Sequence, residues 1–304
     1  MRAVFVDASE TLAAVARRLL RPDDPPVAIH ENPGIAPEDL PGILAGAEIA
    51  VIDHTALPGD VARACAGLRH VVFLGTGARS YMDPEALRDA LGVTVHTIKG
   101  YGDTAVAECA FALMWAAARG LPEMDRAMRA GTWLRTEAIQ LTGKTVGLVG
   151  FGGIAAEMAR LCQGIGMRVL AWNRTPKTHP GVAFVSLEQL LGASDVVSLH
   201  LLLTDETRGF LSAARIAAMK PGAMLINTAR GAVIDEPALI EALRAGRVAR
   251  AGLDVFTIEP LPADHPLAGL PNVTLSAHSA FRTPEASDNL IGAALEHCRR
   301  IAAG

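Results

Sequence analysis

The stretch that decides the fold runs from Val146 to Pro176 and reads VGLVGFGGIAAEMARLCQGIGMRVLAWNRTP. Within it, an apolar run, a glycine turn, a helix-like apolar pattern and a second apolar run follow one another. The turn, Gly150 to Ala155, matches G-x-G-x-x-G/A: the first glycine permits the tight turn, the second lets the backbone approach a pyrophosphate, and the small last residue lets the helix pack close to the strand. Because a predicted strand precedes the motif and a predicted helix follows it, the stretch predicts a dinucleotide-binding unit. The contacts are expected from Gly150, Gly152, Gly153 and Ile154.

The end of the second predicted strand carries Asn173, Arg174 and Thr175. A carboxylate at this place bonds the ribose hydroxyls of NAD and repels the 2′-phosphate of NADP, whereas an arginine accommodates that phosphate. Asn173 removes the carboxylate, and Arg174 adds a planar fork of donors suited to phosphate oxygens. We therefore expect all three residues to contact the cofactor, with NADP(H) preferred and NAD(H) possible. The alternative is an ordinary surface arginine on a loop.

Short apolar runs recur along the chain in two series, five in the first hundred residues and seven from residue 145 on, most of them separated by helical patterns. This alternation predicts an α/β protein with parallel, doubly wound sheets. An alanine-rich segment, 103–119, predicts a buried helix that stops at Gly120 and Pro122. The last segment, from Thr283, predicts a capped amphipathic helix that returns to the N-terminal domain. The expected domains are therefore 1–98 with 282–304, and 99–281.

Composition excludes several classes of function. The chain has 304 residues, a formal charge of -4 and no dense Lys/Arg run, so it shows no electrostatic footprint for nucleic acid or an anionic membrane. No apolar run reaches the length of a membrane span without a polar break. We expect a cytoplasmic globular protein with a small-molecule partner. The four cysteines lie far apart, which predicts reduced thiols and neither a metal site nor a redox motif; they are Cys65, Cys109, Cys162 and Cys298.

Three chemically active side chains, Arg230, Glu259 and His278, each lie just beyond a separate predicted strand of the second series. The carboxyl ends of parallel strands meet at one rim of a sheet, where the glycine turn also lies. There an arginine can grip the carboxylate of a 2-oxo acid, a histidine can pass a proton to or from the oxygen at C2, and a glutamate can favour the protonated imidazole. Each residue alone has an ordinary structural alternative, an ion pair, a loop carboxylate or a hydrogen-bonded histidine. Their joint placement favours hydride-transfer catalysis.

Several ordered motifs together resemble the D-isomer-specific 2-hydroxyacid dehydrogenase family, which includes glyoxylate/hydroxypyruvate reductases, D-lactate dehydrogenases and phosphoglycerate dehydrogenases. The resemblance covers nearly the whole length. The motifs that carry it are GTG at residues 75–77, VAE at 106–108, VGLVGFGGIA, LHLLLTDETRG, INTARGAVIDEPAL, AGLDVFTIEP and AHSA.

The resemblance implies site residues by position. It matches Arg230, Glu259 and His278 to the catalytic arginine, glutamate and histidine of the family. The cofactor contacts that it implies are His200, Leu201, Thr204, Asn227, Thr228, Ala229, Asp254 and His278. The substrate contacts that it implies are Gly75, Thr76, Gly77 and Arg230.

The chain departs from the family pattern at two places. After the GTG turn it reads Ala78-Arg79-Ser80 where many relatives carry an Asp-Asn pair, and Leu202 replaces a frequent proline. Arg79 is expected either to extend recognition toward an acidic tail on the substrate or to point into water. These departures leave the identity of the 2-oxo acid open.

The resemblance also implies a flavodoxin-like substrate domain built from both termini, a Rossmann domain between them, and a homodimer to which the segment 131–143 contributes. The expected activity is NADPH-preferring reduction of a small 2-oxo acid, of the glyoxylate or hydroxypyruvate type, to the D-2-hydroxy acid. Two alternatives stay open: an NAD-dependent dehydrogenase of a larger D-2-hydroxy acid, and a dinucleotide-sensing binding protein on the same fold.

Overall fold

The computed structural model describes all residues from Met1 to Gly304, and the chain folds into two compact units. Unit 1 comprises Met1–Gly102 and Arg282–Gly304, and unit 2 comprises Asp103–Phe281. The first crossing lies after residue 102, whereas the sequence placed it after residue 98. Tyr101 still packs in the core of unit 1, and the first helix of unit 2 begins at Asp103.

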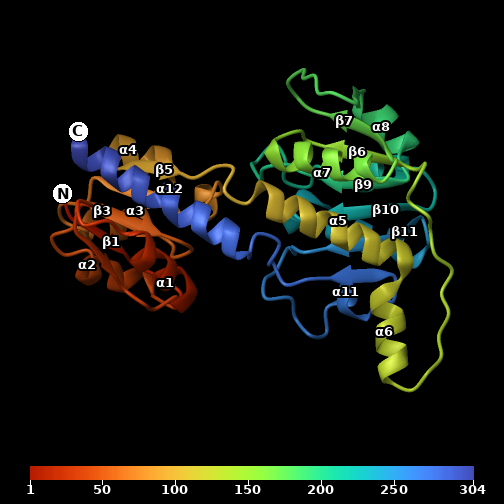
Figure 1. Ribbon diagram of the computed structural model, residues 1–304, viewed down its shortest axis with the longest axis horizontal. Helices are drawn as coiled ribbons and strands as arrows, with labels where there is room; N and C mark the ends of the chain where they lie inside the picture. The colour runs from red at the N-terminus through yellow and green to blue at the C-terminus, as the bar shows by residue number, and fades with distance from the viewer. The chain divides into compact units, whose positions relative to one another are not determined.

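Unit 1 is built on a sheet of five parallel strands in the order β2-β1-β3-β4-β5, which is the flavodoxin-like order. Figure 1 labels β1, β3 and β5 of this sheet. The five strands expected from the first apolar series are confirmed. The strands are β1 (Ala3–Phe5), β2 (Val27–Ile29), β3 (Ile49–Ile52), β4 (His70–Phe73) and β5 (Thr94–Thr97). The helices are α1 (Glu10–Leu19), α2 (Leu40–Ile43), α3 (Gly59–Ala64), α4 (Pro84–Leu91) and α12 (Pro284–Ala303), with single turns at Pro37–Asp39 and Ala78–Ser80.

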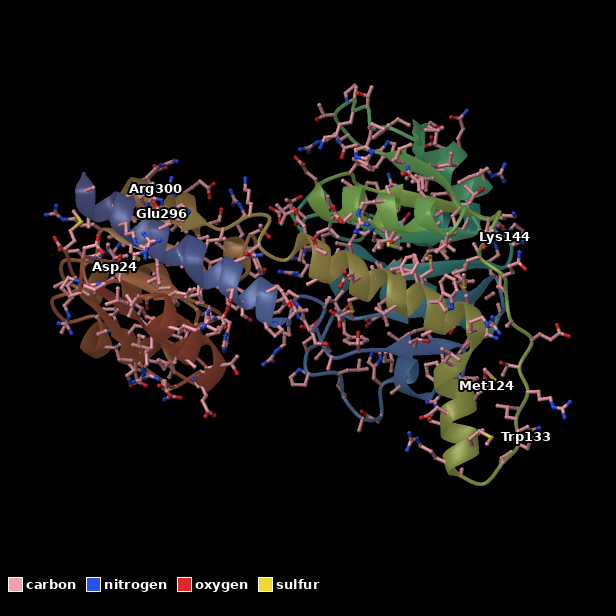
Figure 2. All side chains as sticks on the ribbon, viewed as in Figure 1. Asp24, Met124, Trp133, Lys144, Glu296 and Arg300 are labelled. Carbon is pink, nitrogen blue, oxygen red and sulfur yellow. The ribbon has the colours of Figure 1, made fainter.

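The C-terminal helix α12 belongs to unit 1, as its sequence predicted. The Thr283 hydroxyl caps it by accepting from the Ala286 amide at 3.2 Å. Its apolar face, with Leu290 and Ile291, is buried with residues of α1 and the sheet in one core. Near its other end Arg299 donates to the Asp24 carboxylate at 2.9 Å, in the region where Figure 2 labels Asp24, Glu296 and Arg300. These contacts attach the last helix to the first residues of the chain.

Unit 2 is built on seven parallel strands in the order β12-β11-β10-β9-β6-β7-β8, a doubly wound Rossmann-type sheet. All seven strands expected from the second apolar series are confirmed. The strands are β6 (Thr145–Val149), β7 (Arg168–Trp172), β8 (Val182–Phe184), β9 (Val196–Leu199), β10 (Ala223–Asn227), β11 (Val248–Leu253) and β12 (Val273–Leu275). The helices are α5 (Asp103–Arg119), α6 (Leu121–Arg129), α7 (Gly153–Gly164), α8 (Leu187–Ala193), α9 (Ala213–Ala218), α10 (Glu236–Arg244) and α11 (Pro266–Gly269), with a single turn η3 at Gly231–Val233.

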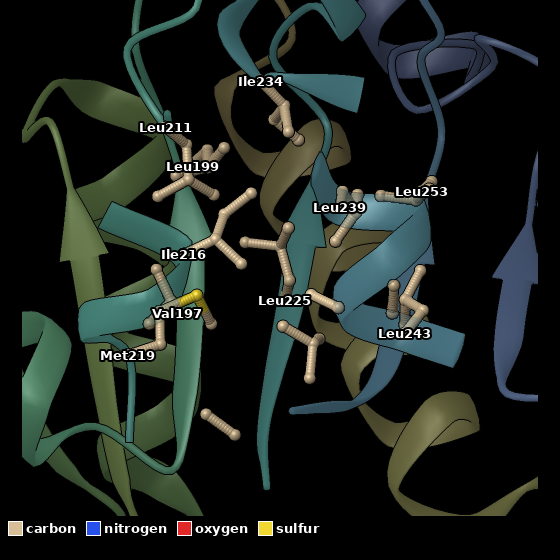
Figure 3. Close-up of a cluster of buried hydrophobic side chains, with 14 of the residues drawn as sticks. Val197, Leu199, Leu211, Ile216, Met219, Leu225, Ile234, Leu239, Leu243 and Leu253 are labelled. Carbon is tan, nitrogen blue, oxygen red and sulfur yellow. The ribbon is translucent and has the colours of Figure 1, made fainter. Parts of the chain in front are cut away.

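Helices cover both faces of the larger sheet, and each face has its own apolar core. On one face, residues of α5 and α7 such as Met114 and Met158 pack with Leu148 of β6. On the other face, α8, α9 and α10 pack on β9, β10 and β11, as Figure 3 shows for Ile216 and Leu239. With both faces covered, the polar chemistry of this unit is confined to the ends of the strands.

The alanine-rich helix α5 has the predicted bounds, but the chain does not leave helical structure after it. Gly120 takes a left-handed conformation (φ 62°) and Pro122 stands in the first turn of a second helix, α6. A proline is tolerated in a first turn because the amide it lacks would have no partner there. None of the helices alone combines the length and apolar character of a membrane span, although α5 and α6 taken together, bent by 64°, meet those criteria of length and composition.

The loop after β3 contains a histidine whose charge contributes to the stability of unit 1. His54 places Nδ1 3.0 Å from the Asp53 carboxylate and Nε2 3.0 Å from the Pro33 carbonyl, an arrangement that needs a proton on both nitrogens. The hydrogen bond to Asp53 raises the pKa of His54 to about 9. Because the pKa is higher in the folded state, this contribution is fully present below the unfolded value of 6.5 and is lost as the pH rises through about 9.

We therefore expect the variant His54→Gln to be less stable than the parent at pH 6, by about 0.5 kcal/mol because the pair is half exposed, and equally stable at pH 10. Urea unfolding at the two pH values measures this difference. Asp53→Asn is the matched variant and should show the same pH dependence. A difference between parent and His54→Gln that stays constant from pH 6 to pH 10 would contradict the assignment.

Candidate active site

The glycine turn between β6 and α7 leaves backbone amides without partners. Gly150 has φ 85°, and a Cβ on it would lie 2.6 Å from the His200 carbonyl oxygen, so only glycine fits. No side chain caps α7, and the amides of Gly152, Gly153 and Ile154 form no hydrogen bond within the chain. Unpaired amides at the N-terminus of a helix attract an anion through their dipoles.

The residues of this turn fit the pyrophosphate of a dinucleotide. A Cβ on Gly152 would meet nothing within 4 Å, so open space lies directly above this part of the backbone. At Gly153, in contrast, a Cβ would lie 1.7 Å from an Oδ of Asp103, the first residue of α5. The sequence did not single out Asp103; burial raises its pKa, and so does the nearby Glu157. The backbone at Gly152 is therefore open to a ligand, whereas a side chain at 153 would have to displace the Asp103 carboxylate.

The variant Gly152→Ala separates these two roles. Its φ of -108° is open to alanine and its methyl group would enter empty space, so we expect an unchanged melting temperature. The same methyl would occupy the place of a pyrophosphate, and we expect the Kd for NADPH and NADH to rise about 10-fold or more, the scale of one to two kcal/mol. Fluorescence titration measures both values. Gly164→Ala, at the far end of α7 and also in open space, is the control. Undiminished dinucleotide affinity in Gly152→Ala would place the ligand elsewhere.

Asn173 and Lys177 hold the glycine turn from the end of β7. The Asn173 Oδ1 accepts from the Phe151 amide at 3.0 Å, and its Nδ2 donates to the Thr175 carbonyl at 2.8 Å. The Lys177 ammonium donates to the Phe151 carbonyl at 2.6 Å. Both side chains therefore stabilise the conformation of the turn through these hydrogen bonds, a role that the sequence did not predict for them. The predicted cofactor contact of Asn173 stays a prediction.

Arg174 extends from the same strand end into solvent and forms an ion pair that spacing in the sequence did not reveal. Its Nη1 lies 2.7 Å from the Glu206 Oε2, in the loop after β9, and the two side chains are 80% and 74% exposed. Thr175, beside it, is also exposed. The guanidinium is therefore accessible, with a carboxylate as its partner.

The loop after β9 lies against the glycine turn, as the contact between Gly150 and the His200 carbonyl requires. The His200 ring is turned to Ser198, with Nε2 2.9 Å from Oγ, and burial lowers the pKa of His200 to about 4. The Thr207 hydroxyl accepts from the Thr204 amide at 2.7 Å and donates to the Leu202 carbonyl at 2.6 Å. His200 and Leu201 thus lie near the turn, and Thr204 follows them in the same loop. The imidazole of His200 is neutral.

The turn after β10 is shaped by a buried asparagine. Asn227 is fully buried; its Oδ1 accepts from the Ala229 amide and its Nδ2 donates to the Arg230 carbonyl, both at 3.0 Å. The partly exposed Arg230 guanidinium donates to the Ala229 carbonyl at 2.7 Å through one nitrogen. Its remaining donors are left for a ligand.

The predicted pair of His278 and Glu259 forms directly. Nδ1 of His278 lies 2.6 Å from the Glu259 Oε2, and the other carboxylate oxygen accepts from the Phe256 amide at 2.9 Å. With Nδ1 donating to a carboxylate, Nε2 is the nitrogen that carries or accepts a proton. No hydrogen bond in the chain engages Nε2, and the two side chains are only about one third exposed. The geometry is that of an oriented acid–base histidine.

Asp254 organises the loop that carries His278. It is fully buried, and its carboxylate accepts from the Ser276 hydroxyl and from the amides of Ser279 and Ala280. Its backbone carbonyl accepts from the His278 amide at 2.7 Å, and His278 takes a left-handed φ of 48°. The sequence indicated a nicotinamide contact for Asp254, which stays a prediction. The loop-holding role became visible only in the structure.

Gly231 brings the Arg230 turn into contact with the loop that carries Glu259. A Cβ on Gly231 would lie 1.9 Å from the Phe256 carbonyl carbon and 2.4 Å from the Thr257 amide nitrogen. The Phe256 amide is the one that binds Glu259, so the arginine turn and the His278–Glu259 pair share one piece of backbone. The three residues predicted as catalytic are thereby connected within unit 2.

The turn at Gly75–Gly77 lies in unit 1, after β4. The Gly75 carbonyl accepts from the Ile98 amide at 3.0 Å, whereas the amides of Thr76 and Gly77 form no hydrogen bond within the chain. Two such amides can bind a carboxylate, so the predicted substrate contact of Gly75, Thr76 and Gly77 keeps a physical basis but stays a prediction. Arg79 pairs with Glu85 of α4 and does not stand free.

The chain is similar to known proteins in both sequence and structure. A family model described as D-isomer specific 2-hydroxyacid dehydrogenase, NAD binding domain, matches residues 111–280. A glyoxylate reductase from Aeropyrum pernix is 39% identical over 70% of this chain and 68% of its own length. A glycerate dehydrogenase from Methylorubrum extorquens is 33% identical over 88% of this chain and 87% of its own. A D-3-phosphoglycerate dehydrogenase from Archaeoglobus fulgidus is 37% identical over 80% of this chain, which spans about half (47%) of that relative's length.

Solved structures of the same fold cover the whole chain. The TT0316 protein from Thermus thermophilus matches with a TM-score of 0.87 and 34% identity over 100% of this chain and 97% of its own. An acyclic imino acid reductase, Bsp5, in complex with NADPH and D-Arg matches with a TM-score of 0.83 and 27% identity over 96% and 94%. Together with the matched family model, these similarities show that the chain belongs to the D-isomer-specific 2-hydroxyacid dehydrogenase family of oxidoreductases and carries its nicotinamide-dinucleotide-binding domain.

Proposed function

We propose that the protein reduces a small 2-oxo acid, of the glyoxylate or hydroxypyruvate type, to the D-2-hydroxy acid, with NADPH preferred over NADH. The observation that carries the proposal is the His278–Glu259 pair, which leaves Nε2 of an oriented histidine free beyond the carboxyl ends of a dinucleotide-binding sheet. The names of relatives support the substrate class, since they include glyoxylate and hydroxypyruvate reductases.

The residues divide the chemistry among them. A nicotinamide cofactor held at the glycine turn by the amides of Gly152, Gly153 and Ile154 would supply a hydride to C2 of the substrate. Arg230 binds the substrate carboxylate through its unused donors and polarises the adjacent carbonyl. His278 gives the proton on Nε2 to the C2 oxygen, and Glu259 stabilises the imidazolium and fixes its orientation through Nδ1. Hydride and proton together convert the carbonyl to the hydroxyl group.

The preference for NADPH is supported by what stands at the end of β7. No carboxylate follows that strand within residues 173–177, and the Arg174 guanidinium is exposed to solvent beside the glycine turn. A guanidinium matches the oxygens of a 2′-phosphate. The NADPH complex of the Bsp5 reductase shows that this fold accepts the phosphorylated cofactor in a similar protein.

Initial rates with glyoxylate and hydroxypyruvate, using NADPH and NADH in parallel, test the proposal. We expect faster turnover with NADPH, and in Arg174→Ala a KM for NADPH raised about 10-fold with little change for NADH, as expected for loss of a charged hydrogen bond. Arg244→Ala, which removes another exposed, ion-paired arginine on α10, is the control.

The outcomes separate the alternatives. Turnover that favours NADH would support an NAD-dependent dehydrogenase, and so would an equal rise of the KM for NADPH and for NADH in Arg174→Ala. A preference for longer 2-oxo acids would support the larger substrate. Tight dinucleotide binding without turnover on any 2-oxo acid would support a dinucleotide-sensing binding protein.

We also propose a homodimer and a cytoplasmic location, the latter from composition alone. The segment formed by α6 and residues 130–140 exposes large apolar side chains: Leu121 is 49%, Met128 48% and Trp133 73% exposed, and α6 buries none of its residues (Figure 2 labels Trp133). A second copy of the chain is the occupant proposed for this surface. Sedimentation velocity should show a dimer for the parent and a weaker one for Trp133→Ser.

A further inference from the structure

The loop after β9 places the Glu206 carboxylate against the guanidinium of Arg174, the residue proposed to bind a 2′-phosphate. β9 and β7 lie on either side of β6, so the loops that follow them are neighbours at the same end of the sheet. The Glu206 carboxylate bridges them by its ion pair with Arg174 at 2.7 Å. It therefore engages the donors that the proposed phosphate contact would use.

Hydrogen bonds hold the backbone on both sides of this ion pair. The Arg174 side is held by the two hydrogen bonds of Asn173 to Phe151 and Thr175. The Glu206 side is held by the Thr207 hydroxyl, which bonds the Thr204 amide and the Leu202 carbonyl. With both loops held by these hydrogen bonds, a carboxylate displaced from Arg174 by another anion would still be carried by backbone next to it.

Charge then decides the effect on the two cofactors. An exposed ion pair is weak, so a phosphate can displace Glu206 from the guanidinium. The displaced carboxylate remains a few ångströms from a dianion, and like charges at that separation repel measurably even in water. NADH has no phosphate there and meets no such repulsion. Lys177, the other nearby cation, is bound to the Phe151 carbonyl.

We propose that Glu206 is a specificity-determining residue that limits the preference for NADPH by competing with the 2′-phosphate for Arg174. This inference rests on the proposed NADPH site at Arg174. Glu206, in the loop after β9, would thus adjust the cofactor preference, although Arg174 itself follows β7.

The test is the Kd for NADPH and NADH, by isothermal titration calorimetry, of the parent, Glu206→Gln, Arg174→Ala and Asp205→Asn. We expect Glu206→Gln to tighten NADPH about 3- to 10-fold and to leave NADH within about 2-fold, as repulsion of one charge at a few ångströms predicts. The gain should shrink at 500 mM salt, because screening weakens exposed charges. Asp205→Asn removes the neighbouring carboxylate and is the matched control.

Failure of the inference is distinguishable from failure of the proposed function. If Arg174→Ala weakens NADPH alone while Glu206→Gln changes neither cofactor, the phosphate site stands and the role of Glu206 is overturned. If Glu206→Gln lowers the Kd for NADPH and for NADH equally, the role of Glu206 is also overturned. The same holds if Asp205→Asn lowers the Kd for NADPH as much as Glu206→Gln does. If Arg174→Ala affects both cofactors equally, the proposed phosphate site itself is wrong.

Discussion

Replacing His278 by glutamine is expected to lower kcat for 2-oxo acid reduction about 10²- to 10⁴-fold, the range for loss of a positioned general acid. The glutamine amide can still reach the Glu259 carboxylate, whose partner Nδ1 now lies at 2.6 Å, but it cannot deliver a proton at neutral pH. The Kd for the dinucleotide should change less than the rate. Steady-state kinetics and a parallel titration with NADPH measure both.

Glu259→Gln is the companion variant. It keeps an oxygen for the Phe256 amide, which Glu259 now binds at 2.9 Å, and removes only the charge that stabilises the imidazolium. We expect a smaller loss of kcat than in His278→Gln, because the amide oxygen can still accept from Nδ1 of His278 while the carboxylate charge beside the imidazole is gone. A kcat equal to that of the parent would show that the charge of Glu259 has no part in the reaction. If the kcat of His278→Gln lies within 10-fold of that of the parent, His278 is not the proton donor.

Gly231→Ala is the second large effect that we expect, through packing. The added methyl would lie 1.9 Å from the Phe256 carbonyl carbon and 2.2 Å from its oxygen, and backbone atoms cannot turn aside as a side-chain end can. The Arg230 turn must therefore separate from the Phe256–Thr257 backbone. We expect a loss of about 3 kcal/mol in the free energy of unfolding, at the upper end for overpacking.

The same separation should move Arg230 and Glu259 apart, so the substrate KM should rise at temperatures where the variant remains folded. Urea unfolding and kinetics at 15 °C measure the two effects. Gly192→Ala in α8 is the control: its methyl meets nothing within 4 Å, and alanine in a helix should raise stability slightly. A Gly231→Ala protein as stable and active as the parent would show that the loops separate at no cost.

Local sequence patterns were reliable for the elements of the fold. The twelve apolar runs became twelve strands, and helix α5 has the predicted bounds. The patterns did not show how the chain continues after a helix. Helix α5 stops at Gly120 as predicted, and Pro122 stands in the first turn of a further helix, α6, because a proline suits the residues after one helix and the first turn of the next equally well.

The candidate site shows the same division. Arg230, Glu259 and His278 were predicted from their residue types and their positions after strands, and the expected contact between the last two is present. Asp103 and Glu206 were not identified, since an acidic residue in a polar stretch resembles any other surface carboxylate. Only their neighbours, Gly153 and Arg174, give them a role.

The sequence by itself determined the two parallel sheets, the order in which strands and helices alternate, the glycine turn and the chemical types at the strand ends. These depend on periodicity and local backbone preference, which are properties of neighbouring residues. Tertiary structure alone decided which carboxylate meets Arg174, that Asp254 holds the loop of His278, and that Gly231 joins the arginine turn to the Glu259 loop. These contacts join residues 25 to 32 positions apart on different strand ends, and the packing of the whole sheet brings them together.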